Sequence, residues 1–272
     1  MDKAYKNLEF LSGPDARIVR ILSEYLEPQS RFARYRIKDT VVFFGSARAL
    51  PADRARRILE EAEARGDARS IDAARVALRL AGYYEAARSL ARHLTEWSKS
   101  LQQPSRRFIV CSGGGPGIME AANRGASEAA GISIGLGISL PEEPPSNPYI
   151  TRELGFEFHY FFMRKFWFVF PAKALVVFPG GFGTLDELFE LLTLVQTVKI
   201  ERRLPILLYG REFWEDLLRL DVLVMWGTIS PEDLRLFHLV NTPEEAFDHL
   251  RTELTSMYLE SEGTNDAGRA SP

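Results

Sequence analysis

The chain has 272 residues, of which 46% are hydrophobic and 26% charged, and its formal net charge is −3. This length and composition are typical of a folded protein of one or two domains, and no basic excess points to nucleic acid as a partner. The single cysteine, Cys111, excludes an intramolecular disulfide and a cysteine-based zinc site. Because no apolar run is long enough to span a bilayer and the first residues lack the apolar core of a signal peptide, we expect a cytoplasmic protein with no membrane partner.

Residues 1–38 are predicted to form a helical extension in front of the main domain. Apolar residues recur in this segment at helical spacing, and they share one side of a helix: Ile18, Ile21, Leu22 and Leu26. We expect this side to pack on the core of the domain that follows.

Residues 52–79 are rich in arginine, alanine and glutamate and are predicted to be a helical insertion without chemistry of its own. The pair Gly66-Asp67 is expected to interrupt its helices. A separate helix is predicted from Tyr83 to about Lys99, because its apolar residues recur on one side.

The rest of the chain alternates short apolar runs with helical patterns. The runs predict strands at residues 41–44, 107–111, 132–140, 174–178, 204–209 and 237–240. The helical patterns cover residues 118–130, 185–200 and 212–225, and Thr242-Pro-Glu-Glu245 is expected to cap a final helix. A proline-rich loop is predicted at residues 141–148.

Strands separated by helices are typical of a parallel sheet joined by right-handed crossovers. We therefore predict the α/β class, with a Rossmann-like, doubly wound parallel sheet and helices on both faces. Residues 39–258 are expected to form this single domain, and the polar residues 259–272 a disordered tail.

Glycine-containing turns follow three of the predicted strands: Gly45-Ser46, Ser112–Gly117 and Pro179–Thr184. In an open parallel sheet, ligands bind beyond the carboxyl ends of the strands, near the point where the strand order reverses. We therefore expect the three turns to point hydroxyl and backbone N–H groups into one crevice.

The turn before Glu187 contains three glycines, Gly180, Gly181 and Gly183. Glycine permits positive φ and close approach of a ligand, and the helix that follows favours an anion such as phosphate at its N-terminus. The alternative is a capped turn, since Thr184-x-x-Glu187 fits a capping box. The two interpretations are compatible, because Thr184 and Glu187 can set the helix start while nearby N–H groups bind phosphate.

Other nucleotide-binding motifs fit poorly. The first turn, Gly45-Ser-Ala-Arg-Ala-Leu, lacks the glycine pattern of a dinucleotide-binding dehydrogenase, and Pro116 in the second turn has no N–H to donate. A Gly-Lys-Ser/Thr P-loop is also absent. The turns therefore favour a single mononucleotide over a dinucleotide as the ligand.

The segment His159–Phe170 is almost entirely aromatic and apolar apart from Arg164 and Lys165. Adjacent residues of a helix point about 100° apart, so the two cations cannot use the same face. A half-buried cation needs an anion, which leaves two alternatives for Arg164. It either pairs with an internal carboxylate or faces the crevice and binds phosphate.

Three motifs together resemble the LONELY GUY (LOG) family, long labelled "possible lysine decarboxylase": Ser112–Met119, Met163-Arg-Lys165 and Pro179–Glu187. The resemblance covers roughly residues 39–250. It implies a phosphoribohydrolase that cleaves the N-glycosidic bond of a nucleoside 5′-monophosphate, either AMP or a cytokinin ribotide, to free base and ribose 5-phosphate. It further implies a homodimer or larger homo-oligomer that needs neither cofactor nor metal.

By motif position, the resemblance implies that Arg164 and Glu187 are the catalytic pair, with Glu187 as general base. The residues expected to bind substrate are Ser46, Gly113, Gly114, Lys165, Gly180, Gly181, Gly183 and Thr184. Glu120 departs from the cytokinin-type pattern, which has glycine there, and this leaves the base unidentified.

The alternative is a non-catalytic nucleotide carrier that resembles the molybdenum-cofactor carriers, and the presence of both Arg164 and Glu187 favours the enzyme. No lysine lies in a recognisable pyridoxal-phosphate context, so the decarboxylase label has no support.

Overall fold

The computed structural model describes residues 3–101, 105–139, 146–200 and 203–260. The described residues form one seven-stranded sheet in the order β4-β3-β2-β1-β5-β6-β7, and all of its neighbouring strands are parallel. The strands are β1 (Thr40–Phe44), β2 (Ile109–Ser112), β3 (Ser133–Ile138), β4 (Gly155–Phe158), β5 (Ala172–Val177), β6 (Ile206–Tyr209) and β7 (His238–Val240). The chain builds outward from β1 in one direction and then returns to build outward from β5, so the strand order reverses between β1 and β5. This is the predicted doubly wound, Rossmann-like fold.

Helices accompany the sheet throughout the described residues. They are α1 (Leu8–Ser12), α2 (Arg17–Arg34), α3 (Ala52–Arg65), α4 (Ala68–Ser100), α5 (Ile118–Glu128), α6 (Phe161–Val169), α7 (Phe182–Gln196), α8 (Arg211–Leu217), α9 (Leu220–Met225) and α10 (Pro243–Leu254). Short 3-10 turns lie at Ala4–Lys6, Pro14–Ala16, Arg152–Leu154 and Pro231–Arg235, and a π-helical turn, Thr255–Glu260, follows α10. Among the described residues, no helix combines the length and apolarity needed to cross a bilayer.

The central strand β1 is buried along its whole length and contributes to two hydrophobic cores. Val41 and Phe43 pack with apolar residues of α4, α5 and α10, whereas Val42 and Phe44 pack with those of α2, α6 and α7. Side chains alternate between the two faces of a strand, so a continuous apolar run is what a sheet covered on both faces requires.

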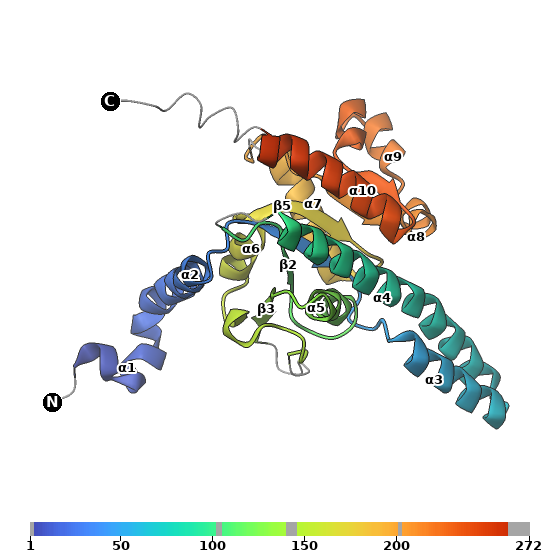
Figure 1. Ribbon diagram of the computed structural model, residues 1–272, viewed down its shortest axis with the longest axis horizontal. Coiled ribbons are helices and arrows are strands. Elements are labelled where there is room, and N and C mark those ends of the chain that lie inside the picture. Colours follow the sequence, from blue (N-terminus) through green and yellow to red (C-terminus); the bar gives the residue numbers. More distant parts are fainter. Residues whose placement is uncertain (1–2, 102–104, 140–145, 201–202, 261–272) are drawn as a thin grey trace.

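The helix α4 runs unbroken from Ala68 to Ser100, although the sequence predicts two helices there. Gly82 lies inside it, in a helical backbone, and a Cβ at this position would meet no atom within 4 Å. The predicted interruption at Gly66-Asp67 is confirmed: Gly66 ends α3 with φ of 70°, and the Asp67 side chain accepts a bond from Ser70 N. The α3–α4 hairpin extends away from the sheet (Figure 1).

The helix α2 forms as predicted, but of the four residues expected to face the core only Ile21 packs against it. Ile18, Leu22 and Leu26 are 71%, 52% and 54% exposed. A neighbouring stripe that contains Tyr25 and Phe32 contacts the core instead, where both rings lie within 6 Å of the Trp167 ring. Aromatic side chains bury more apolar area than Ile or Leu, so their contacts decide which side of the helix faces inward.

Two further predictions need correction. The strand β4 has no counterpart in the prediction, because its four residues at the sheet edge give too short a pattern. The predicted helix over 212–225 is divided into α8 and α9. Residues 141–145 of the predicted proline-rich loop at 141–148, and residues 261–272 of the predicted tail at 259–272, lie outside the described residues.

Candidate functional site

A groove of about 720 Å³ opens at the carboxyl ends of β1 and β5, where the strand order reverses. The loop after β1 and the loop after β5 form much of its wall, and α6 and the first two turns of α7 contribute side chains. The lining residues are Phe44–Arg48, Leu80, Gly113, Met119, Phe161, Arg164, Pro179–Thr184, Asp186, Glu187 and Phe213. This is the position at which doubly wound sheets bind ligands.

Backbone hydrogen bonds join the three glycine turns. Ser46 N donates to Pro179 O at 2.9 Å, and Ile118 N donates to Ser46 O at 3.0 Å. Gly117 permits this contact, because its φ is 73° and a Cβ there would lie 2.2 Å from Ser46 O. The turns therefore meet at one end of the sheet, as predicted.

The start of α7 differs from the prediction. The N-cap residue is Gly181 and the first helical residue is Phe182, so no side chain caps the helix. Thr184 is then the third helical residue and Glu187 the sixth. The expected capping box is therefore absent from this helix, since Thr184 lies too far inside it to act as the N-cap.

The glycines before and in α7 leave room for neighbouring atoms, but none of them adopts a backbone conformation that is restricted to glycine. None of Gly180, Gly181 and Gly183 has a positive φ, contrary to expectation. A Cβ at Gly180 would lie 2.1 Å from the Thr184 hydroxyl oxygen, so glycine permits the turn to contact the helix. A Cβ at Gly181 or Gly183 would meet no atom within 4 Å, which leaves the backbone N–H groups of this helix end open to a ligand.

Arg164 faces the groove from α6. Its Nε donates to the carbonyl oxygen of Leu136 at 2.8 Å, and its guanidinium lies 5.1 Å from the centre of the Phe168 ring. A Cβ at Gly113 would approach the Arg164 Nη2 to 2.7 Å, so glycine at this position leaves room for the cation. Arg164 is thus held in place while it lines the groove.

Glu187 also lines the groove, and it is 7% exposed. Its Oε2 atom is buried and has no hydrogen-bond partner among the described residues. Burial raises the pKa of Glu187 to about 7, although the positive charges of Lys165 and Arg164 oppose the rise. A carboxyl group with a pKa close to neutrality can exchange protons at physiological pH.

Lys165 points to α7 instead of the groove. Its Nζ lies 2.8 Å from Asp186 Oδ2, 2.6 Å from Glu190 Oε2 and 3.9 Å from Glu187 Oε2. It lines a second, more apolar groove of about 750 Å³ between α6 and α7. The two adjacent cations of α6 therefore have different surroundings, as their helical spacing requires.

Of the remaining predicted substrate-binding residues, some line the groove and one does not. Ser46 and Gly113 line the groove, and the Ser46 hydroxyl accepts a bond from Arg48 N at 3.1 Å. Gly114 is not among the lining residues, and its carbonyl oxygen accepts bonds from the backbone and side chain of Asn147. Gly114 therefore belongs to the support of the second turn.

Sequence reasoning did not select Arg48, which lines the groove and is exposed. Its guanidinium has no ion-pair partner within the described part of the chain. Its position directly after the first glycine turn was the signal available in the sequence. Phe161, Phe213 and Leu80 add apolar surface to the same groove.

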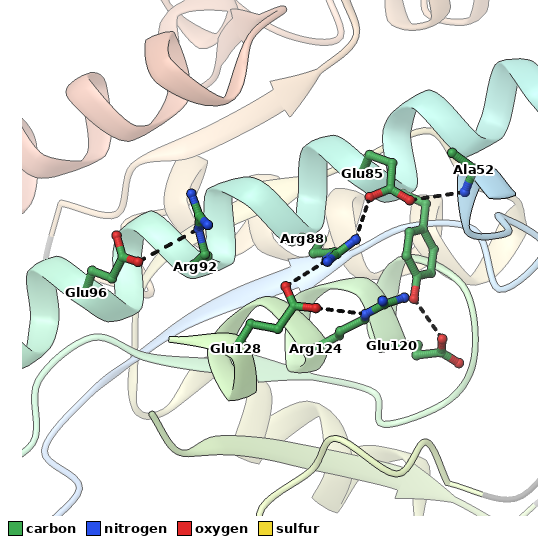
Figure 2. A network of polar contacts seen from close by, with 9 residues as sticks. Ala52, Glu85, Arg88, Arg92, Glu96, Glu120, Arg124 and Glu128 are labelled. Atoms are coloured by element: carbon green, nitrogen blue, oxygen red, sulfur yellow. Dashed lines mark hydrogen bonds and ion pairs between the residues drawn. The ribbon is translucent and has the colours of Figure 1, made fainter. Parts of the chain in front are cut away.

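A polar network joins α4 to α5 (Figure 2). Arg88 contacts Glu85 at 3.0 Å and Glu128 at 2.7 Å, and Arg124 contacts Glu128 at 3.0 Å. Glu85 also accepts a bond from Ala52 N, at the start of α3. The network therefore fixes the helices that follow the groove loops.

Glu120, the residue that departs from the cytokinin-type pattern, accepts a bond from the Tyr84 hydroxyl at 2.7 Å. It is not among the residues that line the groove. Within the described residues, no three His, Cys, Asp or Glu side chains form a group suited to a metal ion.

The fold and the groove define an α/β protein with a Rossmann-like sheet and a candidate ligand site at the reversal of strand order. The family model described as "Possible lysine decarboxylase" matches residues 119–250. This match and the relative described next support the resemblance to the LONELY GUY family.

A pyrimidine/purine nucleotide 5′-monophosphate nucleosidase from Escherichia coli K12 is 31% identical over 179 residues, which cover 61% of this chain. The chain spans 37% of the length of that relative. The same values hold for the protein of that name from Escherichia coli O157:H7.

Among solved structures, the molybdenum cofactor carrier protein from Chlamydomonas reinhardtii is 18% identical, with a TM-score of 0.48 over 80% of this chain and 99% of that one. The structural genomics target TM1055 is 20% identical, with a TM-score of 0.47 over 79% of this chain and 99% of that one.

Proposed function

We propose that this chain hydrolyses the N-glycosidic bond of a nucleoside 5′-monophosphate to free base and ribose 5-phosphate. The observation that carries the proposal is Glu187, a buried carboxyl group with an unpartnered oxygen and a pKa of about 7 in the groove. Buried groups with such a pKa are typical of general acids and bases. The name of the Escherichia coli relative supports the same reaction.

In this proposal the phosphate binds at the start of α7. The open N–H groups from Gly181 to Thr184 and the helix dipole favour a dianion there. Glu187 follows about one helical turn later, so a ribose that extends from this phosphate along α7 would bring C1′ towards its carboxyl group. Binding the remote phosphate would position the sugar for attack.

The chemistry would be a dissociative hydrolysis. The bond between C1′ and the base nitrogen breaks, and positive charge develops on the ribose. The ionised Glu187 stabilises this charge and takes a proton from the water whose oxygen attacks C1′. The base departs with the electron pair of the broken bond and then takes up the proton that Glu187 removed from the water, which leaves Glu187 ionised again; a pKa near neutrality permits both transfers. Arg164 would orient the nucleotide through its fixed guanidinium.

The test is to incubate the protein with a panel of nucleoside 5′-monophosphates that includes AMP and a cytokinin ribotide. Free base and ribose 5-phosphate are measured by chromatography. We expect release from at least one member of the panel, and we expect Glu187→Gln to lose turnover while it still binds that nucleotide. Nucleotide binding without base release from any member would contradict the proposal and support a carrier.

We also propose, from the family resemblance, that the protein is cytoplasmic and forms a homodimer or larger assembly. Exposed aromatic side chains in α6 and at its C-cap, Phe161, Phe162 and Phe170, support self-association, since each is more than half exposed. Light scattering after size-exclusion chromatography would measure the mass in solution. A monomer at micromolar concentration would contradict this part of the proposal.

A further inference from the structure

Lys165 is a charged residue for which the proposed reaction gives no role, because it lies outside the groove that would hold the nucleotide. Its ammonium group is nevertheless surrounded by carboxylates of α7. Asp186 and Glu190 are at hydrogen-bonding distance, and Glu187 is 3.9 Å away. These contacts raise the pKa of Lys165 despite its partial burial, so its charge is permanent at physiological pH.

The atom of Glu187 closest to Lys165 is Oε2, the buried oxygen without a hydrogen-bond partner. A buried carboxylate without bonds to its charged form would hold its proton well above neutrality. The charged groups that act on Glu187 come from two helices. Arg164 and Lys165 of α6 favour its ionised form, whereas Asp186 and Glu190 of α7 disfavour it.

The two cations differ in what else they do. Arg164 lines the groove, bonds to the carbonyl oxygen of Leu136 and would contact the nucleotide. A bound phosphate would offset its charge and weaken its effect on Glu187. Lys165 and its closest partner, Glu190, do not line this groove, although Asp186 does. The effect of Lys165 on Glu187 should therefore depend less on what the groove holds than the effect of Arg164 does.

We propose that Lys165 is a positioning residue that acts from outside the groove: its ammonium group keeps the Glu187 carboxylate ionised and oriented, and Asp186 and Glu190 hold the ammonium in place. The inference rests on the proposed function of Glu187 as the base. It differs from a purely structural tie between α6 and α7, because such a tie would leave the protonation of Glu187 unchanged when the charge is replaced.

The experiment measures the protonation of Glu187 directly in the full chain. Glutamate is labelled with ¹³C at its carboxyl carbon, and the Glu187 signal is assigned by its disappearance in Glu187→Gln. In Lys165→Met we expect the titration midpoint of Glu187 to rise by about one pH unit or more. In Lys165→Arg, which keeps the charge, we expect the midpoint to stay close to that of the wild type.

Lys199→Met is the matched control. Lys199 lines the same apolar groove as Lys165 and is exposed, but it makes no ion pair with α7 among the described residues. Its replacement should leave the Glu187 midpoint unchanged. If Lys165→Met does not fold, Lys165→Gln decides the question. It removes the charge but keeps a side chain that can donate a hydrogen bond to Glu190, so the midpoint should rise as in Lys165→Met.

A folded Lys165→Met or Lys165→Gln variant with an unchanged midpoint would overturn the inference. Measuring base release as well distinguishes failure of the inference about Lys165 from failure of the proposed reaction. If base is released, the acidic limb of kcat/KM should move with the midpoint in each variant. A shifted midpoint in a protein that releases no base would leave the role of Lys165 intact and contradict the proposed function alone.

Discussion

Gly113 lies directly against Arg164: a Cβ at this glycine would approach the Arg164 Nη2 to 2.7 Å and the Met119 sulfur to 2.6 Å. Both neighbouring atoms are ends of flexible side chains, so they can move without unfolding the protein. The guanidinium, however, would be displaced from the position that its bond to Leu136 O defines. The second glycine turn thus sets the position of a cation that comes from a different helix.

We predict that Gly113→Ala lowers kcat/KM by about 100-fold, since misplacement of a positioning group by 1 Å can have this effect, while the free energy of unfolding changes by less than about 1 kcal/mol. Gly115→Ala is the control, because a Cβ there would meet Met119 at 2.9 Å without meeting Arg164. Steady-state kinetics and urea denaturation measure the two quantities. Equal kinetic losses in both variants would show that displacement of Met119, and not of Arg164, is responsible.

Gly183→Ala should make the protein more stable and weaken its binding of the nucleotide. Gly183 lies in the first turn of α7 without a positive φ, and a Cβ there would meet no atom within 4 Å, so the free energy of unfolding should rise by about 0.5 kcal/mol or more. The added methyl group would occupy space that the phosphate needs, and KM should rise. Gly82→Ala, inside α4, should give the same gain in stability with an unchanged KM. An unchanged KM in Gly183→Ala would argue against phosphate at this helix end.

Arg48→Gln should weaken nucleotide binding. Arg48 adds an exposed positive charge, without an ion-pair partner among the described residues, to the lining of the groove. Loss of one charge-assisted contact to a phosphate corresponds to roughly a tenfold rise in KM. Arg56→Gln removes an exposed arginine of α3 that does not line the groove, and it should have no effect. The difference between the two variants should shrink at high salt, which screens exposed charges. If the difference in KM between the two variants persists at high salt, the Arg48 side chain acts through its shape and not through its charge.

The titration of Glu187 predicts how stability depends on pH. The folded pKa, about 7, is above the ordinary value of 4.5, so the folded state binds the proton more tightly than the unfolded state. The free energy of unfolding contributed by this group therefore falls as pH rises from about 4.5 to 7 and is constant above. The loss amounts to roughly 3 kcal/mol at most.

Glu187→Gln removes this titration. The variant should match the wild type near pH 4 and be more stable at pH 8, as measured by urea denaturation at both values. The wild-type kcat/KM should rise with pH through about 7, since the proposed base must be ionised. A variant whose stability differs from that of the wild type by the same amount at both pH values would show that the pKa of Glu187 is the same in the folded and unfolded states, in the ordinary range.

Much of the fold follows from local patterns. The buried strand β1 is a continuous apolar run, and each glycine turn lies directly after a strand. The strand β4 and the inward side of α2 were not predictable in this way. The first is defined by its pairing with β3 at the sheet edge, and the second by aromatic contacts with Trp167 in α6. Both depend on residues distant in the sequence.

In the candidate site too, some features follow from the local sequence and others depend on contacts between distant residues. Adjacent positions in a helix indicate that Arg164 and Lys165 have different surroundings, but the sequence does not say which of the two faces the groove. The role of Gly113 beside Arg164, and the burial of Glu187 Oε2, arise from packing between helices and loops. The groove position of Arg48 also becomes visible when the first turn is seen beside the start of α7.

The backbone of Ser46 bridges the other two turns, with its N–H on Pro179 O and its carbonyl oxygen on Ile118 N. Main-chain atoms make this bridge, so it does not depend on which side chains the neighbouring residues carry. Ala47 and Arg48 can therefore be exchanged for other residues while the groove keeps its shape. For protein engineering, the side chains at positions 47 and 48 can be varied while the backbone of the first turn stays fixed. If the groove binds a nucleotide as proposed, libraries at these two positions are a direct route to altered nucleotide preference.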